Sequence, residues 1–329
     1  MKWTDIVGHV ENIKTLRYME SSKHMPHAVL LSGPSGIGKF MVASVLGAAL
    51  LCISSDSRPC GSCSSCLQMQ YGTHPDYLLV RPDGTAIKIE QIRKLQHEAA
   101  LAPYFSSRRV CIIDSAELMT VQAANSLLKV LEEPAGEIVF ILVSGNKQML
   151  LATILSRCMA IGFQPLTDNL LAQALADRNF SPEQAEVAAR LSRGRMGTAL
   201  SMLEPDGFAV RNQAAKVLES LVEGSMTVVW DTAAALEKME RKDLLQVVGH
   251  FSYLLRDMLM LVTGQGLQLL FNIDLAEKLR GQAGRWSEQR LVKALQAVET
   301  ARRALHGNAN ARLTSEALLI KIYDLVREV

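Results

Sequence analysis

The segment from His27 to Phe40, with the sequence HAVLLSGPSGIGKF, restricts the fold of this chain more than any other. Ala28–Ser32 is a short apolar run with the length of a buried strand. Three glycines and a lysine follow it at the spacing of a phosphate-binding loop: Gly33, Gly36, Gly38 and Lys39. Glycines let backbone N–H groups close around a phosphate, and the N-terminus of the following helix attracts negative charge. The alternative is a strand–turn–helix connection with incidental glycines, which the presence of the lysine disfavours.

The metal-binding part of such a site is incomplete. Phe40 stands where the motif carries Ser or Thr, whose hydroxyl would bind Mg²⁺. The apolar run Val110–Ile113 ends in Asp114, a carboxylate placed to orient Mg²⁺ at the C-terminal end of a strand. Ser115 follows, where hydrolysing relatives of this class carry a water-polarising glutamate, and we expect Glu117 to be turned elsewhere. The loop can therefore cradle ATP or ADP, but it is predicted to bind Mg²⁺ weakly and to hydrolyse nucleotide slowly or not at all.

Length and charge restrict the class of protein. With 329 residues the chain is long enough for two or three domains. The formal net charge of +2 gives no overall basic field, so DNA contact would need a local patch or a partner. The N-terminus has no apolar signal core, and the longest nearly uncharged apolar run, Met41–Ile53, is too short to span a bilayer. These features predict a soluble, cytoplasmic protein without membrane contact.

Four of the six cysteines lie close together: Cys52, Cys60, Cys63 and Cys66. In a reducing cytosol, such a cluster indicates a metal site more often than disulfides. The spacing C-x7-C-x2-C-x2-C can supply four thiolates to a tetrahedral Zn²⁺, which leaves no open position, so the site would be structural. The alternatives are free thiols or one disulfide. Cys111 lies in an apolar run and is expected to be a small core residue.

Apolar runs alternate with helical patterns in the first half of the chain. Five runs have the length of strands: Ala28–Ser32, Tyr77–Val80, Val110–Asp114, Ile138–Val143 and Met159–Phe163. Helical patterns lie between them: Gly38–Leu51, Ile89–Ala102 and Ala116–Glu133. This alternation predicts an α/β domain with crossover units around a parallel sheet. From Leu166 onward the pattern is helical, with a boundary at Pro205–Gly207; the first helices are short: Thr167–Arg178, Ser181–Ser192 and Thr198–Leu203.

Arg157, in the segment Leu155–Cys158, has two interpretations. A lone arginine is by default a surface residue. A planar, permanently charged guanidinium at the edge of a nucleotide-binding domain can also reach the γ-phosphate of a nucleotide held by a neighbouring subunit. The physical chemistry of the residues alone does not decide between them.

Several motifs together produce a specific resemblance. They are DIVGH near the start, HAVLLSGPSGIGK, the cysteine cluster, THPDYLLV (Thr73–Val80), ANSLLKVLEEP (Ala124–Pro134), LLATILSRC (Leu150–Cys158) and NANARLTSEALL (Asn308–Leu319). The chain resembles the delta-prime subunits of the bacterial DNA polymerase III clamp loader, a family within the AAA+ superfamily. The phosphate loop is shared widely, whereas THPD, LLKVLEEP and SRC are diagnostic in combination.

The resemblance implies a three-part architecture. A RecA-like AAA+ domain with a five-stranded parallel sheet would occupy residues 1–165 and include a zinc knuckle at 52–66. A helical lid would follow at 166–207, and a helical collar at 208–329 would join subunits into a ring-like hetero-pentamer. The implied partners are an ATPase motor subunit and a clamp-opening subunit, with the sliding clamp and primed DNA bound by the whole complex.

The resemblance also implies roles for single residues. In the family the arginine of SRC acts in trans on a neighbour's ATP, so Arg157 becomes the arginine finger, and Ser144 matches the sensor position after the fourth strand. Within Gly194–Leu200, Thr198 stands where ATPase subunits carry an arginine, a third missing ATPase element. The implied function is ATP-dependent loading of the sliding clamp for the replicative polymerase, a nucleotidyltransferase complex, by a subunit that does not itself hydrolyse ATP. Some relatives have lost the loop's glycines and lysine; here they remain, so nucleotide binding stays open.

Two other functions stand against this one. An active AAA+ motor subunit would need Ser or Thr at position 40, Glu at 115 and Arg near 198, and the sequence has none of these. A free-standing DNA-binding zinc protein is at odds with the near-neutral charge. Five cations are candidates for a local patch that faces a DNA duplex: Arg93, Lys94, Arg108, Arg109 and Lys129. The alternative is that these charges lie on solvated helix faces, which is more common.

Overall fold

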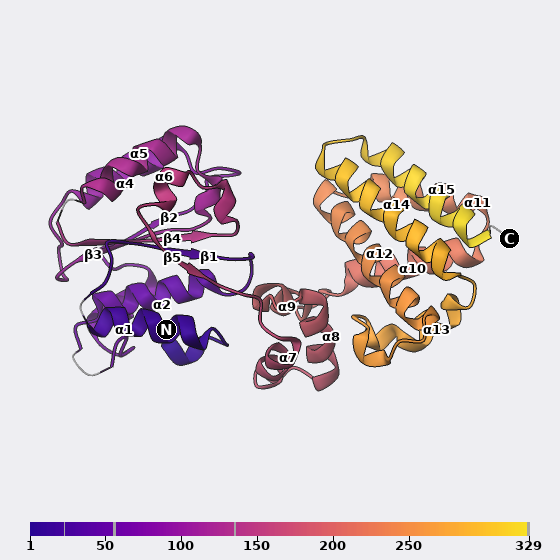
Figure 1. Cartoon of the computed structure of the whole chain (residues 1–329), viewed down its shortest axis with the longest axis horizontal. Coiled ribbons are helices and arrows are strands. Elements are labelled where there is room, and N and C mark those ends of the chain that lie inside the picture. The colour runs from indigo at the N-terminus through magenta and orange to yellow at the C-terminus, as the bar shows by residue number, and fades with distance from the viewer. Residues whose placement is uncertain (23, 55–56, 135, 328–329) are drawn as a thin grey trace. The chain divides into compact units, whose positions relative to one another are not determined.

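A computed structural model describes residues 1–22, 24–54, 57–134 and 136–327 of the chain (Figure 1). It contains two compact units. The first, the sheet unit, comprises Met1–Ala174 and Ser192–Thr198. The second, the helical unit, comprises Leu175–Leu191 and Ala199–Val329. No helix in the described part of the chain is long and apolar enough to cross a membrane.

Five parallel strands form the single sheet of the described residues. They are β1 (Ala28–Ser32), β2 (Tyr77–Val80), β3 (Arg109–Ile113), β4 (Ile138–Ser144) and β5 (Met159–Gly162). Their order is β2-β3-β4-β1-β5, so β1 lies between two strands that come much later in the chain. The predicted α/β class with a five-stranded parallel sheet is confirmed.

Helices cover both faces of the sheet (Figure 1). On one face lie α1 (Val10–Ser21) and α2 (Lys39–Leu51), with α3 (Ser64–Tyr71) against α2; on the other lie α4 (Ile89–Ala99), α5 (Val121–Glu132) and α6 (Ala152–Leu155). Because successive side chains of a strand point to opposite faces, Leu30 belongs to the core beneath α4 and α5, while Val29 and Leu31 belong to the core beneath α2. Two buried layers therefore fix the sheet from both sides.

The predicted helix Ala116–Glu133 is interrupted, which corrects the sequence interpretation. Residues 116–118 form a 3-10 helix, and α5 begins only after Thr120. The Thr120 hydroxyl accepts a hydrogen bond from the N–H of Ala123 at 3.2 Å, while its own N–H donates to the carbonyl of Ile87. An N-cap and a tertiary backbone bond thus end one helix and start another, which apolar periodicity cannot reveal.

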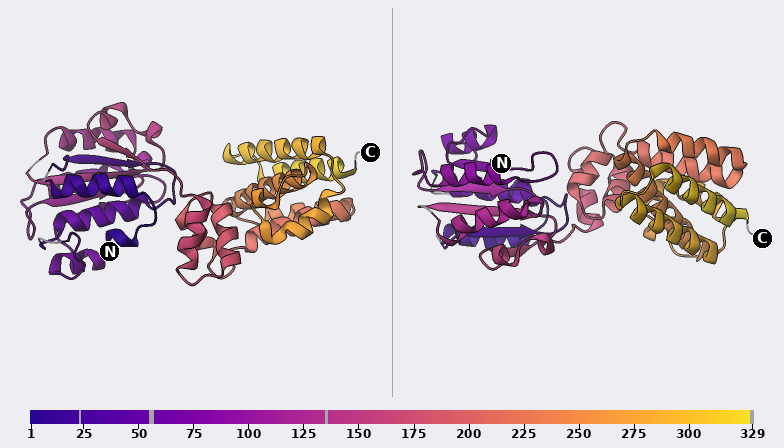
Figure 2. Two further views of the ribbon diagram at one scale, coloured as in Figure 1. Left: turned by 60° about the horizontal axis from the view of Figure 1, so that its bottom comes forward. Right: turned by 90° about the horizontal axis from the view of Figure 1, so that it is seen from above.

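Only helices follow β5 in the described residues. They are α7 (Asp168–Ala176), α8 (Pro182–Ser192), α9 (Met196–Met202), α10 (Ala209–Glu223), α11 (Met226–Glu237), α12 (Arg241–Val262), α13 (Ala276–Ala283), α14 (Glu288–His306) and α15 (Ala311–Arg327). Further 3-10 helices lie at Trp3–Asp5, Lys147–Met149, Leu267–Leu269 and Ile273–Leu275. In the helical unit α12 packs on α10, α13 and α14, and α14 packs on α15 (Figures 1 and 2). The fully buried Phe251 of α12 lies in this core.

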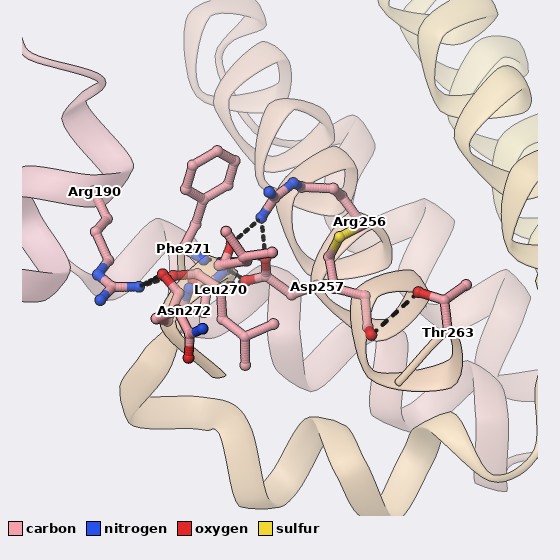
Figure 3. A network of polar contacts seen from close by, with 10 residues as sticks. Arg190, Arg256, Asp257, Thr263, Leu270, Phe271 and Asn272 are labelled. Atoms are coloured by element: carbon pink, nitrogen blue, oxygen red, sulfur yellow. Dashed lines mark hydrogen bonds and ion pairs between the residues drawn. The ribbon is translucent and has the colours of Figure 1, made fainter. Parts of the chain in front are cut away.

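A polar network fixes the segment between α12 and α13 (Figure 3). The fully buried Asp257 of α12 accepts N–H bonds from Phe271 at 3.1 Å and from Asn272 at 2.8 Å. Arg256 donates to a carbonyl of the same segment, and Arg190 of α8 donates to two more. The segment is therefore anchored to both α12 and α8 by charged groups, whose hydrogen bonds are stronger than neutral ones.

Candidate functional site

The phosphate loop joins the end of β1 to the start of α2, as the sequence predicts. Gly33 has a φ of 149°, and a Cβ added there would lie 2.3 Å from the carbonyl oxygen of Phe163, so no larger residue fits. Gly38, the N-cap of α2, has a φ of 98°, which only glycine adopts readily. The glycines at these two positions are therefore required by the backbone path.

Lys39 is the first residue of α2 and is buried, with 4% of its surface exposed. Its Nζ donates to the carbonyls of Gly33 and Pro34, both at 2.6 Å. Burial lowers the pKa of Lys39, while the nearby carboxylates of Glu117 and Asp114 oppose that shift. The lysine thus lies inside the loop, beside two acidic groups.

Those two carboxylates reach the site from the segment that follows β3. The pKa of Asp114 is raised by burial, although Arg81 and Lys39 counteract it. Glu117 was expected to point elsewhere, and that expectation is wrong. Ser115 adopts a left-handed conformation with a φ of 55°, and the 3-10 helix after it turns Glu117 back toward the loop. One Glu117 oxygen, Oε1, accepts the N–H of Gly145 at 2.8 Å, and the other, Oε2, is buried and has no hydrogen-bond partner among the described residues.

Ser144 and Thr198 both lie beside the loop. Ser144, fully buried at the end of β4, pairs in register with Ser32, and its carbonyl accepts the N–H of Gly33 at 3.2 Å. In α9 the N–H of Gly197 donates to the carbonyl of Gly36 at 2.9 Å. A methyl group at Gly36 would lie 3.4 Å from the Thr198 hydroxyl oxygen. The predicted sensor and lid positions therefore meet the phosphate loop.

The four clustered cysteines gather beyond the other end of α2. All four Sγ atoms lie within 4.8 Å of one another, and the Cys52–Cys63 and Cys60–Cys66 sulfurs are each 3.9 Å apart. A tetrahedral metal with metal–sulfur bonds of ~2.3 Å places its sulfurs about 3.8 Å apart, whereas a disulfide needs about 2.05 Å. In the described part of the chain, none of the four thiols forms a disulfide. The cluster fits a tetrahedral metal ion and can bind one.

Local backbone geometry aims these thiols inward. Cys63 is the N-cap of α3, and its Sγ accepts the N–H of Cys66 at 3.4 Å. Backbone N–H groups of Ser62 and Cys63 lower the pKa of Cys60 to about 6, whereas burial raises the pKa of Cys66 to about 12. A bound cation would stabilise the thiolate form of all four.

The THPD motif supports this cluster rather than forming a separate site. His74 is buried, and its Nδ1 accepts the N–H of Asp76 at 3.1 Å, so its Nε2 carries the proton. Nε2 then donates to the Ser65 hydroxyl at 3.0 Å, which itself donates to the carbonyl of Leu51 at 2.6 Å. Burial lowers the pKa of His74, which keeps the ring neutral. The network ties α3 to the end of α2.

Arg157 lies on the turn that follows α6, with 34% of its side chain exposed. Its Nη2 forms an ion pair with Glu132 Oε1 at 2.6 Å, and its Nη1 donates to the carbonyl of Thr153 at 3.0 Å. Glu132 belongs to LLKVLEEP, so two motifs that are separate in the sequence meet here. Neither contact involves the phosphate loop.

Comparison with known proteins identifies the family. A family model described as "DNA polymerase III, delta subunit" matches residues 8–167, and one described as "DNA polymerase III, delta subunit, C terminal" matches residues 211–324. DNA polymerase III subunit delta' of Bacillus subtilis is 30% identical over 98% of this chain and 99% of its own length. The chain belongs to the delta-prime family.

Two more distant matches carry other subunit names. Subunit tau of Bacillus subtilis is 25% identical over 98% of this chain and 61% of its own length. A solved DNA polymerase III gamma subunit-related protein from Thermotoga maritima has a TM-score of 0.49 at 17% identity and covers 95% of this chain and 99% of that chain.

In this delta-prime chain the structure gathers Lys39, Asp114, Ser144 and Thr198 around the loop, while Arg157 lies on another segment.

One of the five cations predicted to face a DNA duplex does not lie on the surface. Arg109 is buried and donates to two backbone carbonyls, so its guanidinium belongs to the interior.

Sequence reasoning missed Arg81, which lies where the sequence predicted only weak Mg²⁺ binding. Its Nε lies 3.6 Å from Asp114 Oδ2, and its Cζ lies 4.5 Å from the centroid of the Phe40 ring. Phe40 offers no oxygen, and the carboxylate of Asp114 already faces a cation. The Phe40 side of the loop therefore fits Mg²⁺ poorly, because the ion needs oxygen ligands and Asp114 already faces Arg81.

Proposed function

We propose that this delta-prime chain serves in the clamp loader as the subunit that completes a neighbour's ATP site with Arg157 and does not itself hydrolyse ATP. The observation that supports it best is the setting of Arg157. The guanidinium is one-third exposed and fixed by Glu132, and it takes no part in its own chain's loop. An arginine so placed is available to a phosphoryl group held by another subunit.

The chain's own loop lacks three elements of an ATPase. Phe40 replaces a metal-binding hydroxyl, Ser115 replaces the water-polarising carboxylate, and Thr198 replaces the lid arginine. Glu117 does lie near the loop, but the N–H of Gly145 engages one of its oxygens. The loop is a binding element without the groups for turnover.

The cysteine cluster is proposed to hold a structural Zn²⁺. Four sulfurs within 4.8 Å of one another would fill every position of a tetrahedral metal ion, so no site would remain for water or substrate. The bound metal would then cross-link the segment between α2 and α3 through Cys52, Cys60, Cys63 and Cys66.

The wider setting is also a proposal. Its partners are a motor subunit and a clamp-opening subunit in a hetero-pentamer, which acts on the sliding clamp and primed DNA in the cytoplasm. The chain would contribute an AAA+ domain at residues 1–165, a lid at 166–207 and a collar at 208–329. Family membership supports this arrangement.

The test is ATP turnover by a reconstituted clamp loader that carries Arg157→Ala. Turnover at the affected interface should fall ~10³-fold, because the transferring phosphoryl group loses a cation, and clamp loading should fall with it. Assembly, measured by light scattering, should not change. Arg17→Ala removes an exposed arginine of α1 and is the matched control. Unchanged turnover in the assembled Arg157→Ala complex would overturn the assignment.

A further inference from the structure

The register of the sheet brings Arg81 to the phosphate loop. β2 and β3 pair in parallel with Val80 opposite Ile113, so the residues that follow them, Arg81 and Asp114, come side by side. The N–H of Asp114 donates to the carbonyl of Val80 at 2.9 Å, which fixes this edge. The 3.6 Å pair between Arg81 and Asp114 is therefore a consequence of strand pairing.

Phe40 provides the second contact of the Arg81 guanidinium. It is the second residue of α2, and its ring faces the Arg81 guanidinium at 4.5 Å, within the range of a cation–π contact. Replacing Ser or Thr by Phe thus does more than remove a hydroxyl from the metal position. It supplies an aromatic surface on which an organic cation can lie.

We propose that Arg81 is the resident cation of this site, and that the loop binds nucleoside di- or triphosphates free of divalent metal. The ion pair with Asp114 uses Nε, and the guanidinium fork carries two further nitrogens that can donate to phosphate oxygens. Arg81 remains 54% exposed, so a ligand at the loop can reach it.

The charges around the loop agree with binding of a metal-free anion. Lys39 and Arg81 face the carboxylates of Asp114 and Glu117 at this end of the loop, and the side chain of Arg195 lies against Gly36. Arg81 repels a divalent ion at this place, and it offsets the repulsion between the two carboxylates and a nucleotide that carries its full negative charge.

The primary test needs no mutation. Binding of fluorescent ADP and ATP to the purified chain is measured by anisotropy in EDTA and again in excess Mg²⁺, with bound Mn²⁺ followed by electron paramagnetic resonance. We expect binding in EDTA at least as tight as in Mg²⁺, and no Mn²⁺ taken up with the nucleotide. Tighter binding in Mg²⁺, stoichiometric Mn²⁺, or no nucleotide binding in either buffer would overturn the proposal.

Variants then assign the effect to Arg81. In EDTA, Arg81→Ala should weaken binding at least about tenfold, the loss expected for a charged hydrogen-bond partner. Lys88→Ala removes a cation from an exposed pair with Asp83 near the same strand and should have no effect. Arg81→Ala combined with Phe40→Thr should bind Mn²⁺ with the nucleotide. An Arg81→Ala variant that melts like the wild type and binds equally well would refute the role, and none of these results bears on Arg157.

Discussion

At the scale of the single residue, Asp76 shows how a diagnostic motif can be structural. Its fully buried carboxylate accepts three backbone N–H bonds, from Tyr104 at 2.6 Å, Phe105 at 2.8 Å and Ser106 at 2.7 Å. Burial raises the pKa of Asp76, but these donors and Arg109 outweigh it, and the pKa is lowered. The carboxylate therefore organises the loop before β3.

We expect Asp76→Asn to reduce the free energy of unfolding by about 2 kcal/mol near pH 7, because it weakens charge-assisted hydrogen bonds in the interior. The folded pKa lies below the unfolded value of about 3.9, so the carboxylate's contribution is complete above that pH and is lost as the pH falls through the folded pKa. The difference between variant and wild type should shrink below about pH 4.

Urea titrations across that pH range check this prediction. Asp83→Asn, at a 73% exposed side chain, is the matched control and should change stability little at any pH. An equal loss for Asp76→Asn at neutral and acid pH would contradict the linkage to ionisation.

Single residues also show where sequence reasoning succeeds. Lys39 and Asp114 could be placed because a glycine loop and a strand that ends in an acid are local patterns. The sequence did not place Glu117 and Arg81 at the site. Glu117 depends on the left-handed turn at Ser115, and Arg81 depends on the register between β2 and β3. Both are set by tertiary geometry.

At the scale of the element, the cysteine-bearing segment is short and has little core of its own. Its helix α3 buries few apolar side chains, among them Met69, and relies on Ser65 for its bond to Leu51. A metal ion bound by the four thiolates would therefore add a strong restraint on this segment. The sequence spacing predicted the ligand set; the support from His74 required the fold.

Purified protein should carry about one equivalent of zinc, and chelation should release the segment around α3 while the sheet stays intact. Metal analysis and hydrogen exchange resolved by residue measure the two effects. Cys63→Ser should lose the metal, and Cys158→Ser, at a half-buried thiol outside the cluster, should keep it. A folded, metal-free preparation with the cluster protected from exchange would contradict the zinc assignment.

At the scale of the whole molecule, the alternation of apolar and helical patterns predicted a parallel sheet followed by helices. The two compact units are divided within α7 and within α9. The division into parts at residues 1–165, 166–207 and 208–329 stays a prediction.

The isolated chain should show no ATP hydrolysis above background in a steady-state assay. The chain lacks the metal-binding hydroxyl, the water-polarising carboxylate and the lid arginine, because Phe40, Ser115 and Thr198 stand at their positions. Each of the missing groups supports turnover in active members of the class. Lys39→Ala should leave this baseline unchanged. Robust turnover that Lys39→Ala abolishes would instead make the chain a motor in its own right.

The central place of β1 affects how the chain folds during synthesis. β1 ends at Ser32, but its two partners, β4 and β5, begin only at Ile138 and Met159. At about 5–20 residues per second, the ribosome takes on the order of ten seconds to make the intervening stretch. During that time a mostly apolar strand lacks both of its partner strands, so we expect the nascent sheet unit to be prone to aggregation until β4 and β5 have been made.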